Sequence, residues 1–337
     1  MKWDYRLEEE FDKKGPGLFI VNEGNFQYGN ASLSFYDPAT GEVSNELFIK
    51  ANGFKLGDVA QSMTMHEGMG WIVVNNSHVI FAIDADTFKE KGRIENLTSP
   101  RYIHFIDDEK AYVTQIWDNR IFIVNPKEYK ITGYITVPGM TMESGSTEHM
   151  VQLGKYVYVN CWSYQNSILK IDSEKDEIVD RLEVGIQPQS LALDCNRRLW
   201  TTTDGGYEGS PYGYEEPKLV RIDTETFTIE KEWRFELGHT LRELQLNGTG
   251  DKLYWLDDDV WCMDVNADAP PSKPYIESRG TIYYGLTVSP ETGDVYVADA
   301  VDYQQPGTIY RYGPDGEITS EFNVGVNPAA FAWKRAK

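Results

Sequence analysis

Positive charge is in short supply in this sequence. Lysine and arginine number 32 against 53 aspartate and glutamate residues, which gives a formal net charge of −21 at pH 7. Nucleic-acid binding requires a basic surface, and anionic lipid attracts basic segments. We therefore expect neither a nucleic-acid partner nor docking to an acidic membrane, and we interpret the acidic surface as one that keeps the protein soluble.

Cysteines and long apolar runs are scarce as well. The three cysteines, Cys161, Cys195 and Cys262, are odd in number and widely spaced, so they predict neither a disulfide framework nor a zinc site. No apolar run is long enough to predict a transmembrane helix. The first residues, Met1 to Glu8, contain charged side chains from Lys2 on, so we expect no export signal among them.

Catalytic and metal-binding motifs are few. There is no nucleophile elbow and no His-Glu-x-x-His motif. Residues Asp264 to Asp268 imitate the start of a calcium loop, but Ala269 stands where that loop needs glycine. We therefore predict no metal and no cofactor. Glu148 and His149, with Arg101 as an anion clamp, are the one candidate acid–base pair, and a purely structural pair is the commoner alternative.

What the sequence does contain is a repeat. Leu18–Asn22 is a short apolar run that ends in a polar residue, and the same pattern returns six more times, rich in β-branched and aromatic residues as strands are. The copies are residues 18–22, 71–75, 111–115, 156–160, 199–203, 253–257 and 295–299. Their average spacing of roughly 46 residues is typical of a four-stranded propeller blade.

Each repeat predicts four strands, which we call A to D, with the apolar run as strand B. The first repeat has no A strand before Leu18, whereas residues 327–333 have the A pattern with no B strand after them. Pairing of these two ends would close a ring and remove its exposed sheet edges. We predict an all-β, seven-bladed β-propeller of four antiparallel strands per blade, closed by the C-terminal strand in the N-terminal blade. An open β-solenoid, the alternative, gives no reason for complementary ends.

The domain organisation follows from this repeat. Residues 1–16 are charged and lead into Gly15–Gly17, so we interpret them as an N-terminal extension. Residues 17–337 then form a single seven-bladed propeller domain. We expect a monomer.

The loops between strands B and C predict a binding surface. In a propeller these loops and the D–A connections surround one mouth of the central channel, and here several are long and carry aromatic residues among Gln, Asn, Gly and Asp. Such rings suit a large ring-bearing or sugar-like ligand. Alternatively, they pack against each other and stiffen the loops. The candidates are Phe26, Tyr28, Trp117, Trp162, Tyr164, Tyr207, Tyr212, Tyr214 and Tyr303.

The starts of the A strands add polar candidates at the same mouth. Aligning the repeats gives a first ring of Gln61, Arg101, Glu148, Gln189, Arg242, Tyr284 and Ala329. It gives a second ring of Ser62, Tyr102, His149, Ser190, Glu243, Gly285 and Ala330. Of these, Arg101, Gln189 and Arg242 join the aromatic residues as predicted ligand-binding residues. Water and mutual Arg–Glu pairing would fill such rings equally well. We expect the polar ends of the B strands to cap the B–C loops.

A resemblance to known propellers rests on two sequence features. The lead-ins Gly185–Pro188 and Gly325–Pro328 are typical of the YncE/YVTN group of seven-bladed propellers. The opening residues 18–25, followed by 31–37, resemble surface layer proteins of gut anaerobes. One branch of that group is the BtuG-type lipoproteins, which capture cobalamin and pass it to an outer-membrane transporter. The lipidated cysteine of such proteins is not in this chain.

The resemblance implies a non-enzymatic binding protein at the cell surface or outside the cell. Its ligand would be a large small molecule, with a cobalamin-like corrinoid as the best candidate, and an outer-membrane transporter would be its partner. Two other hypotheses remain open. One is a propeller lyase or lactonase that uses Glu148 and His149 with a divalent metal. The other is a protein–protein interaction module that uses the rim.

Overall fold

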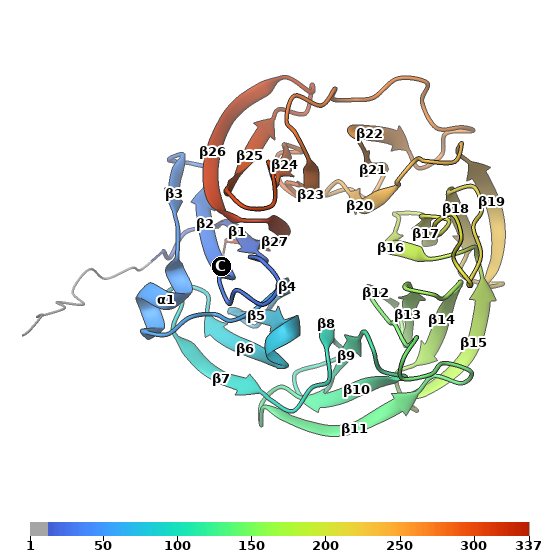
Figure 1. The fold of residues 1–337 in the computed structure, drawn as a ribbon, viewed down its shortest axis with the longest axis horizontal. Coiled ribbons are helices and arrows are strands. Elements are labelled where there is room, and N and C mark those ends of the chain that lie inside the picture. The colour runs from blue at the N-terminus through green and yellow to red at the C-terminus, as the bar shows by residue number, and fades with distance from the viewer. Residues whose placement is uncertain (1–12, 337) are drawn as a thin grey trace, which may run out of the picture.

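The chain folds as a β-propeller. The computed structural model describes residues 13–336, and in that range the strands form seven sheets arranged around a central channel (Figure 1). The predicted seven-bladed, all-β architecture is therefore confirmed. Most of the predicted N-terminal extension, residues 1–12, lies outside the described residues. In residues 13–336 no helix is long and apolar enough to cross a membrane.

The blades follow one another along the chain, each with its A strand innermost (Figure 1). Blade 1 contains β27 (Pro328–Lys334), β1 (Gly17–Asn22), β2 (Ser32–Asp37) and β3 (Glu42–Ser44). Blade 2 contains β4 (Ala60–His66), β5 (Met69–Val74), β6 (Val79–Asp84) and β7 (Glu90–Ile94). Blade 3 contains β8 (Pro100–Phe105), β9 (Ala111–Gln115), β10 (Arg120–Asn125) and β11 (Lys130–Thr136). Blade 4 contains β12 (Met150–Leu153), β13 (Tyr156–Cys161), β14 (Ser167–Asp172) and β15 (Glu177–Glu183).

The remaining blades continue in the same order. Blade 5 contains β16 (Pro188–Leu193), β17 (Arg198–Thr203), β18 (Lys218–Asp223) and β19 (Thr228–Arg234). Blade 6 contains β20 (Arg242–Leu246), β21 (Lys252–Asp257) and β22 (Asp259–Asp264). Blade 7 contains β23 (Tyr283–Val288), β24 (Val295–Asp299), β25 (Pro306–Tyr312) and β26 (Ile318–Val326). A short helix, α1 (Leu47–Asn52), follows β3, and a 3₁₀ turn, η1 (Asn75–Ser77), follows β5.

Blade 6 departs from the regular pattern at its outer edge. In the described residues its D position holds no full strand, and only Ile276 bridges Val260 of β22. The segment leading there contains Pro270, Pro271 and Pro274. Proline has no backbone N–H to donate to a sheet ladder, so this segment follows β22 irregularly.

Ring closure is as predicted. Strand β27 pairs antiparallel with β1, with Leu18 opposite Trp333 and Gly17 opposite Lys334. The indole nitrogen of Trp333 donates a hydrogen bond of 3.0 Å to Thr287 of blade 7. The buried Lys334 ammonium lies 2.6 Å from the Asp86 carboxylate of blade 2. The closing strand is thus bonded to the blades on both sides of it.

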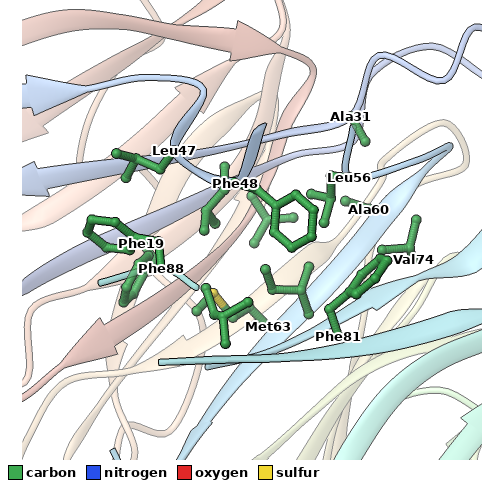
Figure 2. Close-up of a cluster of buried hydrophobic side chains, with 14 of the residues drawn as sticks. Phe19, Ala31, Leu47, Phe48, Leu56, Ala60, Met63, Val74, Phe81 and Phe88 are labelled. Carbon is green, nitrogen blue, oxygen red and sulfur yellow. The ribbon is translucent and has the colours of Figure 1, made fainter. Parts of the chain in front are cut away.

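The hydrophobic core lies between blades and not at the ring's centre. Between blades 1 and 2, Phe19 packs edge-on against Phe35 at 5.0 Å and against Phe88 at 5.8 Å. Helix α1 adds the buried Leu47 and Phe48 to this cluster (Figure 2). Because the sheets pack face to face, the inner edges of the A strands are left to line a channel.

Removal of the closing strand tests how far the fold depends on it. A chain ending at residue 327 would expose the edge of β1 and the Phe19 cluster, a loss comparable with the whole stability of a domain, about 5–15 kcal/mol. We expect no cooperative thermal transition by circular dichroism and aggregation on size-exclusion chromatography. The matched control ends at Lys334, which keeps β27, and should unfold like the full chain. Cooperative unfolding of the shorter chain near the control's melting temperature would contradict the role given to closure.

Candidate functional site

A cavity of about 720 Å³ opens at the mouth of the channel. Residues of all seven described blades line it, and every position of the predicted first ring is among them. Five members of the second ring also line it, namely Ser62, Tyr102, His149, Glu243 and Ala330. The other two are turned to neighbouring blades: the Ser190 hydroxyl accepts a hydrogen bond from the Leu244 amide, and a side chain at position 285 would collide with the Ala329 backbone, where Gly285 fits. We call this space the mouth cavity.

The two arginines of the first ring are held by the protein itself. Arg101 Nε donates to both carboxylate oxygens of Glu148, at 2.8 and 3.1 Å, and its Nη1 donates to Gln61. Ser146 donates a further bond of 3.1 Å to Glu148. Arg242 Nη2 donates to the Tyr283 carbonyl at 2.6 Å. Mutual Arg–Glu pairing, one of the two sequence interpretations, therefore describes Arg101, and its charge is neutralised within the cavity.

His149 is a neutral member of the cavity. Burial lowers its pKa to about 4, so the imidazole carries no charge at pH 7. Its Nδ1 lies 3.2 Å from the Gln189 carbonyl, which fixes the proton on that nitrogen and leaves Nε2 as an acceptor. The ring centre lies 4.1 Å from that of Tyr102. Glu148 and His149 thus lie in the cavity as the sequence suggested, each already engaged in hydrogen bonds.

Two carboxyl groups in the cavity were not singled out as binding residues from the sequence. Glu23 follows β1 and accepts a hydrogen bond of 2.8 Å from the Tyr284 hydroxyl, and burial raises its pKa. Glu243 has a positive φ of 55°, at an irregularity in the pairing of β20 with β21. Burial raises the pKa of Glu243 to about 7. Among the described residues its carboxyl group has no hydrogen bond or ion pair.

Two of the nine predicted aromatic residues, Phe26 and Trp162, line the mouth cavity. The indole nitrogen of Trp162 donates to Asp204 at 3.0 Å. The same carboxylate accepts a bond of 3.1 Å from Gln189 and one of 2.8 Å from Gln187. Asp204 therefore fixes two cavity residues at once, Trp162 of another loop and Gln189 of strand β16, a role that the sequence did not suggest because these partners are distant in the repeat.

Three more predicted rings form an aromatic row on the rim, made of Trp117, Tyr164 and Tyr212. The ring centres of Trp117 and Tyr164 are 6.2 Å apart, and those of Tyr164 and Tyr212 are 4.5 Å apart and stacked. Trp117 and Tyr212 remain 46% and 50% exposed. The row thus combines both sequence interpretations, since its rings pack on each other and still present open faces.

The other four predicted rings lie outside both the cavity lining and the aromatic row. Tyr303 lies edge-on to the cavity residue Tyr284, at 5.6 Å between ring centres. Tyr28, Tyr207 and Tyr214 are exposed on their loops, without a ring contact among the described residues. The structure therefore brings five of the nine rings to the cavity or to one row, and a sixth against the cavity wall.

The polar ends of the B strands act as predicted only in part, since Thr203 accepts from the Lys218 amide and Asp299 from the Val301 amide within their own B–C loops. We expected them to cap the B–C loops, but most hold the D–A connections. Asn75 donates to the Pro100 carbonyl at 2.9 Å, Asn160 to the Pro188 carbonyl at 2.7 Å, and Asp257 accepts from the Thr240 amide at 2.9 Å. In five blades the last side chain of strand B therefore fixes the start of the cavity wall, namely Asn75, Gln115, Asn160, Asp257 and Asp299.

Within residues 13–336, no three His, Cys, Asp or Glu side chains gather as a group that could hold a metal ion.

Comparisons with known proteins place the chain in a family and a fold. The family model described as "Domain of unknown function (DUF5074)" matches residues 16–325. No curated protein sequence matches. The chain is similar in structure to a periplasmic gluconolactonase of Pseudomonas aeruginosa, with 12% identity and a TM-score of 0.70 over 96% of this chain and 100% of that one.

Two further structures support the fold. A putative 6-phosphogluconolactonase of Bacteroides fragilis has 12% identity and a TM-score of 0.70, over 95% of this chain and 98% of that one. The hydrazine synthase of Kuenenia stuttgartiensis has 16% identity and a TM-score of 0.63, over 80% of this chain and 88% of that one. At such identities the likeness shows the shared propeller fold alone.

The raised pKa of Glu243 predicts a pH dependence of stability. The ordinary value is 4.5 and the folded value is about 7, so the folded state binds this proton more tightly than the unfolded state. The group therefore stabilises the fold below pH 4.5, and that contribution is lost as the pH rises through about 7.

Glutamine at position 243 mimics the protonated carboxyl group, so the Glu243→Gln variant should not lose stability from this site as the pH rises. Across that pH window, we expect the melting temperature of the native protein to fall relative to the variant by on the order of 2–4 °C or more. Calorimetry at several pH values measures it, with the exposed Glu317→Gln as the charge-matched control. A constant difference between native protein and variant would show that Glu243 does not titrate there.

Proposed function

This chain belongs to the DUF5074 family, and we propose that it is a non-enzymatic binding protein that captures a large small molecule at the mouth of its channel. The observation that carries the proposal is the mouth cavity itself, which draws on all seven described blades and has Phe26 and Trp162 in its wall. A cobalamin-like corrinoid is the candidate ligand, captured at the cell surface for transfer to an outer-membrane transporter. Location and transporter are supported by the sequence resemblance.

The state of the polar groups favours binding over catalysis. Glu148 is engaged by Arg101 and Ser146, and His149 is anchored through Nδ1 to a backbone carbonyl. An acid–base catalyst must exchange protons with its substrate. Glu148 would first have to break its bonds to Arg101 and Ser146, and the low pKa of His149, about 4, makes its free Nε2 a weak base at pH 7. A wall of fixed hydrogen-bonding groups is instead what a binding site requires to orient its ligand.

The size of the site sets how a corrinoid would bind. The mouth cavity, at about 720 Å³, is of the size that holds a drug-sized ligand. A corrinoid is considerably larger, so its macrocycle would lie across the rim, where the aromatic row offers open ring faces. Only its peripheral amide arms would enter the cavity. There Gln61, Gln189 and Gln245 offer matching amide groups.

Titration with cobalamin tests this assignment. We expect binding at micromolar concentrations by calorimetry and absorbance. Trp162→Ala should weaken it about fivefold or more, or about 1 kcal/mol, as loss of an aromatic anchor does. Tyr134→Ala is the control, because Tyr134 is an exposed ring on the outer strand β11. Absence of heat and of any spectral change would exclude the corrinoid, and equal weakening by both variants would exclude the mouth as its site.

A lactonase is the second candidate, favoured by the gathering of Glu148, His149 and Arg101 in one cavity. The charge of Arg101 is already paired with Glu148, and three carboxyl groups line the same space against two arginines, so a phosphorylated substrate would meet repulsion. An uncharged sugar lactone is the substrate class that fits. Its hydrolysis adds one water across the ester bond and releases a hydroxy acid.

Proton release on hydrolysis makes this activity measurable by pH-stat with glucono-lactone. If the protein is a lactonase, the double variant Glu148→Gln with His149→Ala should lower the rate above background at least about a hundredfold, the usual contribution of acid–base groups. Glu317→Gln should keep the full rate. Activity that survives the double substitution, or no activity above the spontaneous rate, would reject the lactonase.

A further inference from the structure

The mouth cavity contains more carboxyl groups than cationic partners for them. Glu23, Glu148 and Glu243 face Arg101 and Arg242, which leaves one carboxyl in excess, and His149 is neutral. Glu148 forms an ion pair with Arg101. Arg242 directs Nη2 to a backbone carbonyl, and although its charge lowers the pKa of Glu243, burial outweighs that effect. Glu243 and Glu23 therefore lack an ion-pair partner in the described structure.

Burial of the two carboxylates of Glu23 and Glu243 in one cavity costs free energy. Each carboxylate loses water in the cavity, and the charge of Glu23 adds to the raised pKa of Glu243. The only hydrogen bond to either carboxyl group comes, in the described residues, from the Tyr284 hydroxyl to Glu23. A positive group in the cavity would relieve this repulsion and supply the missing hydrogen-bond donors.

Aromatic rings line the same cavity as the two carboxyl groups. Tyr102, Tyr284 and Phe331 form part of its wall, and the Tyr284 hydroxyl donates to Glu23 at 2.8 Å. The charge of Glu243 contributes to the raised pKa of both tyrosines, which places it within electrostatic range of each hydroxyl. Carboxylates together with ring faces form the environment that proteins use to recognise organic ammonium groups.

We propose that the mouth cavity contains a subsite for a protonated amine, held between Glu243 and Glu23 against the ring of Tyr284. It lies in the cavity of the proposed function but does not depend on the corrinoid, whose macrocycle would lie on the rim. The ligand class that it assigns is an organic cation with an aromatic or similarly flat body. The titratable and charged groups that line the cavity together with Glu243 are Glu23, Arg101, Tyr102, Glu148, His149, Arg242 and Tyr284.

Three small molecules of similar size and shape distinguish the effect of ligand charge on binding from the effect of ligand shape. Tyramine carries an ammonium group on a phenol ring, tyrosol carries a hydroxyl in its place, and 4-hydroxyphenylacetate carries a carboxylate. Calorimetry and ligand-observed NMR at pH 7.5 measure their affinities for the full chain. We expect tyramine to bind at least about tenfold more tightly than tyrosol, and the carboxylate to bind most weakly.

Glu243→Gln keeps the shape and removes the charge, so it should reduce the preference for tyramine over tyrosol to less than about threefold. Glu23→Gln should reduce it in part, and the exposed Glu317→Gln should leave it unchanged. Melting temperatures confirm that each variant is folded. Equal affinities of the native protein for tyramine and tyrosol, a preference for the carboxylate, or a preference that survives Glu243→Gln would overturn the subsite.

The two proposals fail separately. Binding of cobalamin without binding of tyramine at millimolar concentration would reject the amine subsite and leave the proposed function in place. Binding of tyramine without cobalamin would reject the corrinoid and keep the subsite. If neither binds, both are wrong.

Discussion

The pairing of β27 with β1 is the constraint on which the rest of the molecule depends. It joins the last residues of the chain to the first strand, and Trp333 and Lys334 extend the connection to blades 7 and 2. Once the ring is closed, each sheet packs its faces against its neighbours, and the cores lie between blades. Seven inner strands then surround a channel too wide for their side chains to fill, which is why a cavity exists.

Closure also determines which polar groups meet. Arg101 of blade 3 and Glu148 of blade 4 are 47 residues apart in sequence, yet the ring brings them into a two-oxygen contact. Glu23 of blade 1 meets Tyr284 of blade 7 across the closure itself. A protein with a net charge of −21 thus places one ion pair, two carboxyl groups without an ion-pair partner and the single further cation Arg242 in the same enclosed space of the described structure. In that space each charge is felt more strongly than on the surface.

The sequence predicts the framework well because the framework is periodic. The spacing of the B strands, the complementary ends and the seven positions of the first ring all follow from the repeat, and strand alternation carries each side chain to the channel. The features that the sequence did not predict are the irregular ones, in blade 6 and at Glu243. Three prolines remove the outer strand of blade 6, and the bulge at Glu243 depends on a backbone conformation that no pattern marks.

The loops were predictable in composition but not in arrangement. Trp117, Tyr164 and Tyr303 all have left-handed backbone conformations, with φ values of 58°, 63° and 62°. Such conformations cost residues other than glycine free energy, and in a B–C loop they decide which way a ring faces. The role of Asp204 could not be predicted from the repeat, because its bonds to Trp162 and Gln189 join blades 4 and 5. Contacts between loops leave no periodic trace in the sequence.

The division between strands and loops separates two kinds of recognition. The charged groups of the cavity lie on or beside inner strands that two neighbouring blades hold in place, so their geometry is rigid and suits discrimination by charge. The rings of the rim lie on long loops, where stacking tolerates small displacements and suits recognition of a flat surface. Trp162 belongs to both regions, since Asp204 ties its indole to the cavity wall while its loop carries Tyr164 into the aromatic row. A ligand that engages both must therefore present a flat body to the rim and a polar arm to the channel, in that order along its approach.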